Sequence, residues 1–153
     1  MNKALMALTL FAALTLAACG SRQDLSVSSN LYPGETPQMR ALIREYAQVH
    51  DIPEALLHRV IQRESDYRAN ARNGPYYGLL QILPQTARGM GFEGADSDLL
   101  VADTNLKYAV KYLRGAWLLS DGSHDTAVNW YSRGYYYEAK RRGMLVETGL
   151  RKG

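Results

Sequence analysis

Apolar residues recur at helical spacing in every periodic stretch between residues 37 and 142, and this pattern restricts the chain to a mainly helical domain. The alternation of apolar and polar residues that is typical of strands is not sustained anywhere. Residues 66–77 have no sustained period and contain the turn signal Asn73-Gly74-Pro75, which predicts a loop. The stripes and their boundary signals predict helices over residues 37–49, about 54–65, 84–88, from a cap at Asp103 or Thr104 to about 120, and about 125–142.

A glutamate interrupts the apolar stripe of the second predicted helix. The stripe runs through Leu57, Val60 and Ile61, and its next position, seven residues after Leu57, is Glu64. Partial burial and the negative end of the helix dipole both favour the protonated carboxyl group, which is the form that a general acid requires. The alternative is a glutamate that turns to solvent or pairs with a neighbouring arginine. This stretch alone does not decide between the two interpretations.

The first residues predict an export signal. A charged start and a short apolar run mark residues 1–18 as a lipoprotein signal peptide, because Leu16-Ala17-Ala18-Cys19 resembles the bacterial lipobox. In that motif the cysteine is lipidated and becomes the mature N-terminus; an ordinary signal peptide with an unmodified Cys19 is the alternative. A lipid on Cys19 would attach the protein to a membrane of the bacterial cell envelope. Gly20 after the cysteine favours the periplasmic face of the outer membrane.

Composition and charge divide the rest of the chain. Residues 19–36 are rich in Ser, Gln and Asn and predict a tether, residues 37–143 predict one domain, and residues 144–153 predict a C-terminal tail. The formal net charge is only +3, too mild to indicate a nucleic-acid partner. The chain has 11 tyrosines against 2 phenylalanines, a balance that suits either a wet, sugar-binding groove or the margin of a helical core.

Several kinds of catalytic site lack their residues. His50, His58 and His124 do not have metal-ligand spacing, and with a single cysteine a zinc site is not expected. His58 and Ser65 are seven residues apart, about 10 Å along a helix, which is too far for a direct hydrogen bond between base and nucleophile. We therefore expect no metal and no cofactor. Acid–base chemistry on a carboxylate remains.

A second catalytic carboxylate is not evident from the sequence. Glycosidases with two carboxylates place them about 5–9.5 Å apart. Asp66 lies two residues from Glu64 and would face another side of the helix. The fold could bring another aspartate close to Glu64, but nothing singles one out among Asp96, Asp98 and Asp103.

Two motifs together resemble a known family. The segment Glu64-Ser65-Asp66-Tyr67, followed after a loop by the segment from Gly78 to Ala87 (GLLQILPQTA), is similar to the soluble lytic transglycosylase type of murein-cleaving domain. The resemblance extends over residues 37–142 in the order of its elements. Leu80 replaces the family's methionine. In the third motif, residues 130–134 (WYSRG) keep the family's tyrosine and glycine, while Ser132 replaces its asparagine.

The resemblance implies an all-helical, lysozyme-like domain with a cleft that binds peptidoglycan glycan strands. It implies that Glu64 protonates the glycosidic oxygen between N-acetylmuramic acid and N-acetylglucosamine. Glu64 then acts as base for the muramic acid 6-hydroxyl, which attacks the anomeric carbon and leaves a 1,6-anhydro sugar. This internal nucleophile explains how one carboxylate can suffice.

The resemblance also assigns roles to other residues. Ser65 and Gln81 would form hydrogen bonds around the acid and the substrate, Tyr131 would position Glu64, and Ser132 would contact the glycan near Tyr131. Structural roles are the alternatives: Ser65 can end the helix, and Tyr131 can belong to the core. A buried Gln81 needs a partner in either case. Three aromatic residues are candidates for lining the groove, namely Tyr76, Tyr77 and Trp130.

Two other functions stay open at this stage. A hydrolytic, lysozyme-like muramidase would require an aspartate across the cleft from Glu64. A wall-binding lipoprotein without turnover would keep the groove, and the altered motif around Ser132 motivates that alternative. No protein partner is indicated.

Overall fold

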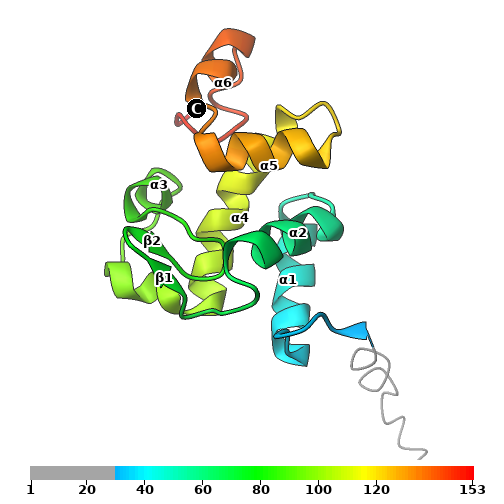
Figure 1. The fold of residues 1–153 in the computed structure, drawn as a ribbon. Helices are drawn as coiled ribbons and strands as arrows, with labels where there is room; N and C mark the ends of the chain where they lie inside the picture. Colours follow the sequence, from blue (N-terminus) through cyan, green and yellow to red (C-terminus); the bar gives the residue numbers. More distant parts are fainter. Residues whose placement is uncertain (1–29) are drawn as a thin grey trace, which may run out of the picture.

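The computed structural model describes residues 30–153, and within them the predicted mainly helical class is confirmed (Figure 1). The predicted signal peptide and Cys19 lie outside the described residues. Among the described residues, no helix combines the length and the apolarity needed to cross a membrane. The elements in chain order are α1 (Pro37–Val49), α2 (Glu54–Glu64), β1 (Arg72–Asn73), β2 (Tyr76–Tyr77), α3 (Pro84–Gly89), the 3-10 helix η2 (Asp96–Leu100), α4 (Ala102–Leu118), α5 (His124–Arg133) and α6 (Tyr136–Arg142).

Helix α1 begins and ends where the sequence predicts. The Thr36 side chain caps it by accepting a hydrogen bond of 3.1 Å from the Met39 amide, and Pro37 occupies the first helical position, where its missing amide hydrogen costs nothing. Its apolar stripe, which includes Ile43 and Ala47, is buried. Helix α2 likewise buries its stripe and ends at Glu64, so the interrupting carboxylate is the last helical residue.

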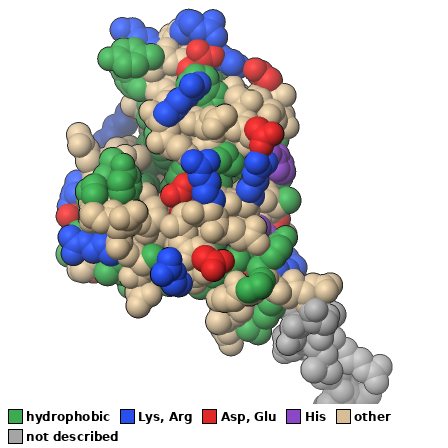
Figure 2. Space-filling view, viewed as in Figure 1, with side chains coloured by type: hydrophobic (Ala, Val, Ile, Leu, Met, Phe, Trp, Pro, Cys, Tyr) green, Lys and Arg blue, Asp and Glu red, His purple; other side chains and the backbone are tan. Residues whose placement is uncertain are grey.

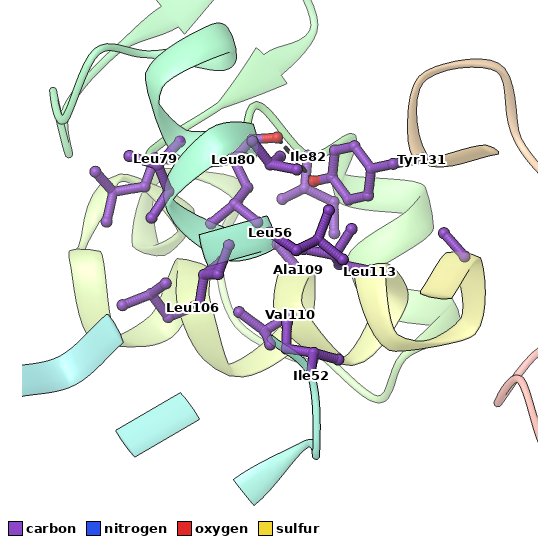
Figure 3. Packing of buried hydrophobic residues seen from close by; sticks show 14 of the residues in the cluster. Ile52, Leu56, Leu79, Leu80, Ile82, Leu106, Ala109, Val110, Leu113 and Tyr131 are labelled. Atoms are coloured by element: carbon purple, nitrogen blue, oxygen red, sulfur yellow. Dashed lines mark hydrogen bonds between the residues drawn. The ribbon is translucent and has the colours of Figure 1, made fainter. Parts of the chain in front are cut away.

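The long helix α4 forms the centre of the domain, and the other elements pack around it (Figure 1). Its inward face is fully buried and contacts Leu56 of α2 together with the turn that carries Leu79 and Leu80 (Figure 3). This core fixes the end of α2 relative to that turn. The buried residues of α4 on this face are Leu106, Ala109, Val110, Leu113 and Ala116.

The predicted single helix over residues 125–142 is wrong, because the chain breaks at Gly134 into α5 and α6. Gly134 has φ +81° and ψ 151°, a backbone conformation that residues with a Cβ atom rarely adopt. The break turns Tyr135 into the core, where it is 1% exposed and donates a hydrogen bond of 2.8 Å to the Tyr112 carbonyl oxygen. Tyr135 therefore precedes the first residue of α6 rather than lying inside a helix, and its side chain makes no capping hydrogen bond. Gly143 ends α6 in the left-handed conformation, as predicted.

The predicted loop over residues 66–77 contains a small hairpin. Two-residue strands β1 and β2 pair antiparallel around the Gly74-Pro75 turn, with Arg72 opposite Tyr77 and Asn73 opposite Tyr76. Strands this short show no alternation in the sequence, so the turn was predictable and the pairing was not. The 3-10 helix η2 was also not predicted.

Both ends of the described chain pack against the helices. Residues 30–36, which composition assigns to the tether, include the buried Glu35, so this part of the tether belongs to the packed structure. In the C-terminal segment, Thr148 is 2% exposed, and a Cβ atom on Gly115 of α4 would lie 2.8 Å from the Thr148 carbonyl oxygen. The segment after Gly143 is therefore in close contact with α4.

Candidate active site

A continuous groove crosses the domain at the end of α2. One lobe is lined by Arg63, Glu64 and Asn73, and the second lobe extends towards α3 and the end of α5. Four residues line both lobes and join them: Tyr76, Gln81, Tyr131 and Ser132. The second lobe is completed by Ile82, Leu83, Thr86, Tyr112, Arg133 and Gly134.

Glu64 lies in the first lobe in a half-buried setting. Its side chain is 23% exposed, and burial raises the pKa of its carboxyl group. The positive charge of Arg63, whose Nε lies 3.7 Å from Glu64 Oε1, opposes this rise and lowers the pKa in part. The net effect favours the protonated acid at a higher pH than for an ordinary glutamate. A carboxyl group with this property beside a groove suits proton donation to a bound substrate.

Tyr131 connects α5 to the turn that forms the groove wall. Its hydroxyl donates a hydrogen bond of 2.8 Å to the Leu80 carbonyl oxygen (Figure 3). Its ring packs edge-on against Tyr112, with 5.6 Å between the ring centroids. Burial, aided by the nearby charge of Glu64, raises the pKa of the Tyr131 phenol well above its ordinary value. The phenol therefore stays protonated and remains a donor, and it fixes the groove wall close to Glu64.

The Gln81 side chain forms hydrogen bonds that stabilise the same turn. It is a non-glycine residue with φ +48°, and its amide nitrogen donates to the Gly78 carbonyl oxygen at 2.8 Å and to the Ala71 carbonyl oxygen at 3.1 Å. Both bonds use the NH₂ group of the side chain, so the amide oxygen keeps its acceptor capacity. Gln81 therefore holds the loop before the hairpin against the turn after it.

A buried asparagine of α4, not predicted as a site residue, supports the turn from below. Asn105 is 0% exposed; its Oδ1 accepts from the Leu80 amide at 3.0 Å, and its Nδ2 donates to the carbonyl oxygens of Tyr77 at 2.8 Å and Leu99 at 2.9 Å. Gly78 must be glycine here, because a Cβ atom would lie 2.2 Å from Asn105 Nδ2 and the residue has φ +75°. The sequence feature that could have indicated this role is an amide side chain beside the apolar stripe of α4.

Not every predicted site residue reaches the groove. Ser65 is 2% exposed, and its Oγ donates to the Ile61 carbonyl oxygen at 3.4 Å, so it lies at the end of α2 behind Glu64. Tyr77 is buried beneath the Arg72 guanidinium, which lies 4.7 Å from its ring centroid. Among the described residues that line the two lobes, neither Ser65 nor Tyr77 occurs. Trp130 does not line the lobes either.

The other predicted residues do meet at the groove. Glu64, Gln81, Tyr131 and Ser132 line it, and Tyr76 lies at the junction of the two lobes. The Ser132 hydroxyl donates to the Val128 carbonyl oxygen within α5 at 2.9 Å. Sequence reasoning missed four groove residues. Arg63, Asn73 and Tyr112 lie outside the motifs, and Arg133 stands at the variable position of the third motif.

Glu64 is the one carboxylic acid among the described residues that line the groove. The three aspartates that the sequence left open have partners elsewhere. Asp96 pairs with Arg88 at 2.6 Å, Asp98 accepts from the Ala95 amide at 3.0 Å, and Asp103 accepts from the Tyr46 hydroxyl at 2.8 Å. Within residues 30–153, no group of three or more His, Cys, Asp or Glu side chains has the arrangement of a metal site.

The groove lining carries charges of both signs, from Arg63, Arg133 and Glu64. On the face shown in Figure 2, Lys and Arg side chains are interspersed with Asp and Glu side chains. Within the groove, Arg63 lies beside Glu64, and outside the groove Arg59 of α2 pairs with Asp125 of α5.

The residues that line this groove lie within a part of the chain that matches the model of a known protein family. A family model described as "Transglycosylase SLT domain" matches residues 41–141, a range that includes Glu64, the hairpin, the turn around Gln81 and both lobes of the groove. The comparison with solved structures found no match.

Proposed function

The chain belongs to the transglycosylase SLT domain family, and on this premise we propose that it is a peptidoglycan lytic transglycosylase in which Glu64 acts first as acid and then as base. The bond cleaved is the β-1,4 bond between N-acetylmuramic acid and N-acetylglucosamine. The observation that carries the proposal is one half-buried carboxyl group with a raised pKa, in a groove whose described lining holds no other carboxylate.

In the first step, the protonated Glu64 donates its proton to the glycosidic oxygen. The bond between that oxygen and the muramic acid anomeric carbon breaks, and the N-acetylglucosamine leaves with a free 4-hydroxyl. The raised pKa supports this step because it keeps a larger fraction of Glu64 in the acid form near neutral pH.

In the second step, the Glu64 carboxylate accepts the proton of the muramic acid 6-hydroxyl. The 6-oxygen then bonds to the anomeric carbon and closes the 1,6-anhydro ring, and Glu64 is again protonated. No water is consumed, so this route needs no second carboxylate to activate one. A hydrolytic mechanism would place a second carboxylate about 5–9.5 Å from the first.

The residues around Glu64 support this chemistry by holding the groove wall. Tyr131 and Asn105 fix the Leu80 backbone from two sides. Gln81 presents an amide oxygen that can accept from a sugar hydroxyl or an acetamido group. Ser132, whose hydroxyl already donates within α5, would offer its remaining acceptor capacity to the glycan.

Digestion of purified cell-wall sacculi, followed by mass analysis of the soluble muropeptides, tests the proposal. We expect products that end in 1,6-anhydro-N-acetylmuramic acid. Products with only reducing-end muramic acid would contradict it and indicate a hydrolytic muramidase. Saturable binding without release of muropeptides, beside an active reference enzyme, would indicate a wall-binding protein instead.

We also propose that Cys19 carries a lipid that anchors the domain at the periplasmic face of the outer membrane, and the lipobox-like sequence before it supports this. Metabolic labelling with an alkyne fatty acid should label the full chain, and Cys19→Ala should abolish the label. A labelled Cys19→Ala variant, or an unlabelled native chain in cells that label other lipoproteins, would contradict the anchor.

A further inference from the structure

The turn that follows Glu64 has an unfavourable backbone conformation. Asp66 has φ 51° and Tyr67 has φ 61°, so two successive non-glycine residues lie in the left-handed region. Such residues persist where the surrounding structure forces them into place, and they concentrate at functional sites. We refer to residues 64–68 as the catalytic turn. The question is which contacts hold it.

One contact comes from within α2. The Tyr67 side chain is 3% exposed, and its hydroxyl lies 2.8 Å from Nδ1 of the buried His58. Burial raises the pKa of the Tyr67 phenol, and burial lowers the pKa of His58 against the opposing charge of Glu35. The phenol is therefore the donor and the neutral imidazole the acceptor. This bond holds the Tyr67 ring against α2.

The second set of contacts comes from residues 30–36, which we call the N-terminal strap. The Tyr32 ring stacks on the Tyr67 ring, with 5.9 Å between the ring centroids and 13° between the ring planes. The Tyr32 ring also packs against the His58 ring, with 4.9 Å between their centroids. Gly34 approaches the turn so closely that a Cβ atom there would lie 3.1 Å from the Asp66 carbonyl oxygen. The strap thus contacts both left-handed residues, of which Tyr67 is buried and Asp66 is exposed.

An ion pair fixes the strap to α1. Arg40 Nε donates to Glu35 Oε1 and Arg40 Nη2 donates to Glu35 Oε2, each at 2.6 Å, and the Glu35 side chain is 0% exposed. Arg40 Nη2 also donates to the Asn30 carbonyl oxygen at 3.1 Å, and the Tyr32 amide donates to Glu35 Oε2 at 3.0 Å. Burial would raise the pKa of Glu35, but the hydrogen bonds from Arg40 and Tyr32 outweigh it and hold the pKa below the ordinary value. Glu35 therefore remains charged and paired.

We propose that the strap is a positioning element for the catalytic turn, in which Tyr32 and Gly34 hold Asp66 and Tyr67 in their left-handed conformations and so fix the orientation of the Glu64 carboxyl group. The strap does not line the groove, so it acts through the turn rather than on the substrate. The inference rests on the proposed role of Glu64 as the acid, because the strap would otherwise stabilise a turn without catalytic consequence.

The test uses the full chain with Tyr32→Ala, which removes the stacked ring, and Tyr32→Phe, which keeps it. We expect Tyr32→Ala to lower kcat about tenfold with KM nearly unchanged, because a small misplacement of a catalytic group mainly affects the transition state. The alkaline limb of the pH profile should move to lower pH, because a loosened turn gives the Glu64 carboxyl group more water. Tyr32→Phe should restore both values.

Two further measurements separate positioning from loss of stability. Tyr46→Ala removes a tyrosine that bonds Asp103 from α1 and does not contact the turn, so it should lower the midpoint of unfolding without moving the pH profile. Hydrogen exchange should be at least several-fold faster in Tyr32→Ala at the Asp66 and Arg68 amides, which donate to the Ile61 and Ser65 carbonyl oxygens. If Tyr32→Ala does not fold, Tyr32→Leu replaces it.

An unchanged kcat and an unchanged pH profile in a folded Tyr32→Ala chain would overturn the inference. An equal loss of kcat and an equal pH shift in Tyr46→Ala would also overturn it, since the effect would then follow stability alone. The exchange measurement does not depend on activity. A native chain that yields no anhydro product would refute the proposed function, while exchange at the turn would still show whether the strap holds it.

Discussion

Burial and the neighbouring Arg63 together determine the pKa of Glu64, the candidate acid. Burial raises the pKa of Glu64, and the Arg63 guanidinium at 3.7 Å lowers it in part. Arg63 is half-exposed, so solvent weakens its effect on the pKa of Glu64. In the proposed mechanism Glu64 must be protonated to begin the reaction, so activity should fall as the pH rises through its raised pKa.

Arg63→Gln should move the alkaline limb of the kcat/KM profile to higher pH, because it removes the charge that opposes the effect of burial. We expect a shift of a few tenths of a pH unit, the size appropriate to a partly solvated ion pair. The matched control is Arg59→Gln, which removes an arginine of α2 that pairs with Asp125 instead. A limb that moves to lower pH in Arg63→Gln, or moves equally in Arg59→Gln, would contradict this account.

At the scale of elements, the groove wall depends on a hydrogen-bonded turn more than on regular structure. The turn from Tyr77 to Ile82 passes through Gly78 and Gln81, both with positive φ, and closes through hydrogen bonds between the backbones of Tyr77 and Ile82 at 3.1 Å in each direction. Asn105 holds this turn on α4. The conformation of the groove wall therefore depends on the buried hydrogen bonds of the Asn105 side chain.

Asn105→Ala should destabilise the domain by about 3 kcal/mol, because it leaves the Leu80 amide and two buried carbonyl oxygens without their partner. Denaturant unfolding measures this loss. Asn129→Ala, at an exposed position of α5, is the control and should change the free energy of unfolding by less than about 0.5 kcal/mol. Equal stability of Asn105→Ala and the native chain would show that the network does not hold the turn.

The helices were largely predictable from the sequence, and their exceptions have physical causes. Thr36-Pro37 marked the start of α1, and the stripe of α2 ended at Glu64, within a residue of the prediction. The break at Gly134 was missed because Tyr135 continues the apolar stripe of α5, so periodicity alone did not reveal that the backbone turns there.

The sequence motifs predicted part of the lining of the candidate site, but they did not show where every side chain of a motif lies. Glu64, Gln81, Tyr131 and Ser132 do line one groove. Ser65 bonds back to Ile61 in the last turn of α2 and Tyr77 lies under Arg72, so both are buried outside the lobes, and the motifs alone do not show this. The strap, which begins at Asn30, is assigned to the tether by its polar composition. Glu35 in the strap is nevertheless buried, because its carboxylate pairs with Arg40 of α1.

At the scale of the whole molecule, Gly115 marks where α4, the start of α6 and the C-terminal segment meet. A Cβ atom at this position would lie 2.2 Å from the Tyr135 hydroxyl oxygen and 2.8 Å from the Thr148 carbonyl oxygen. Close approach of these three parts requires a residue without a side chain. The C-terminal segment, predicted as a tail, therefore contributes to the packing of the domain.

Gly115→Ala should lower the thermal midpoint even though alanine favours a helix by about 1 kcal/mol over glycine. The added methyl group collides with Tyr135 and the C-terminal segment, and we expect a net loss of about 1–3 kcal/mol. Gly89→Ala is the matched control, because a Cβ atom there meets no atom within 4 Å. A Gly115→Ala chain that is more stable than the native chain would contradict the described packing.

The central claim is that Glu64 alone performs both proton transfers, and one comparison tests it most directly. Native and Glu64→Gln chains are matched for folded fraction by their unfolding midpoints and incubated with the same sacculi, and the anhydro-muropeptides released are quantified by mass. Glutamine is nearly the same size as glutamate but cannot exchange the proton, so the account predicts release by the native chain and a loss of at least about 1,000-fold in Glu64→Gln. Anhydro product from a folded Glu64→Gln chain at near-native rate would contradict the account.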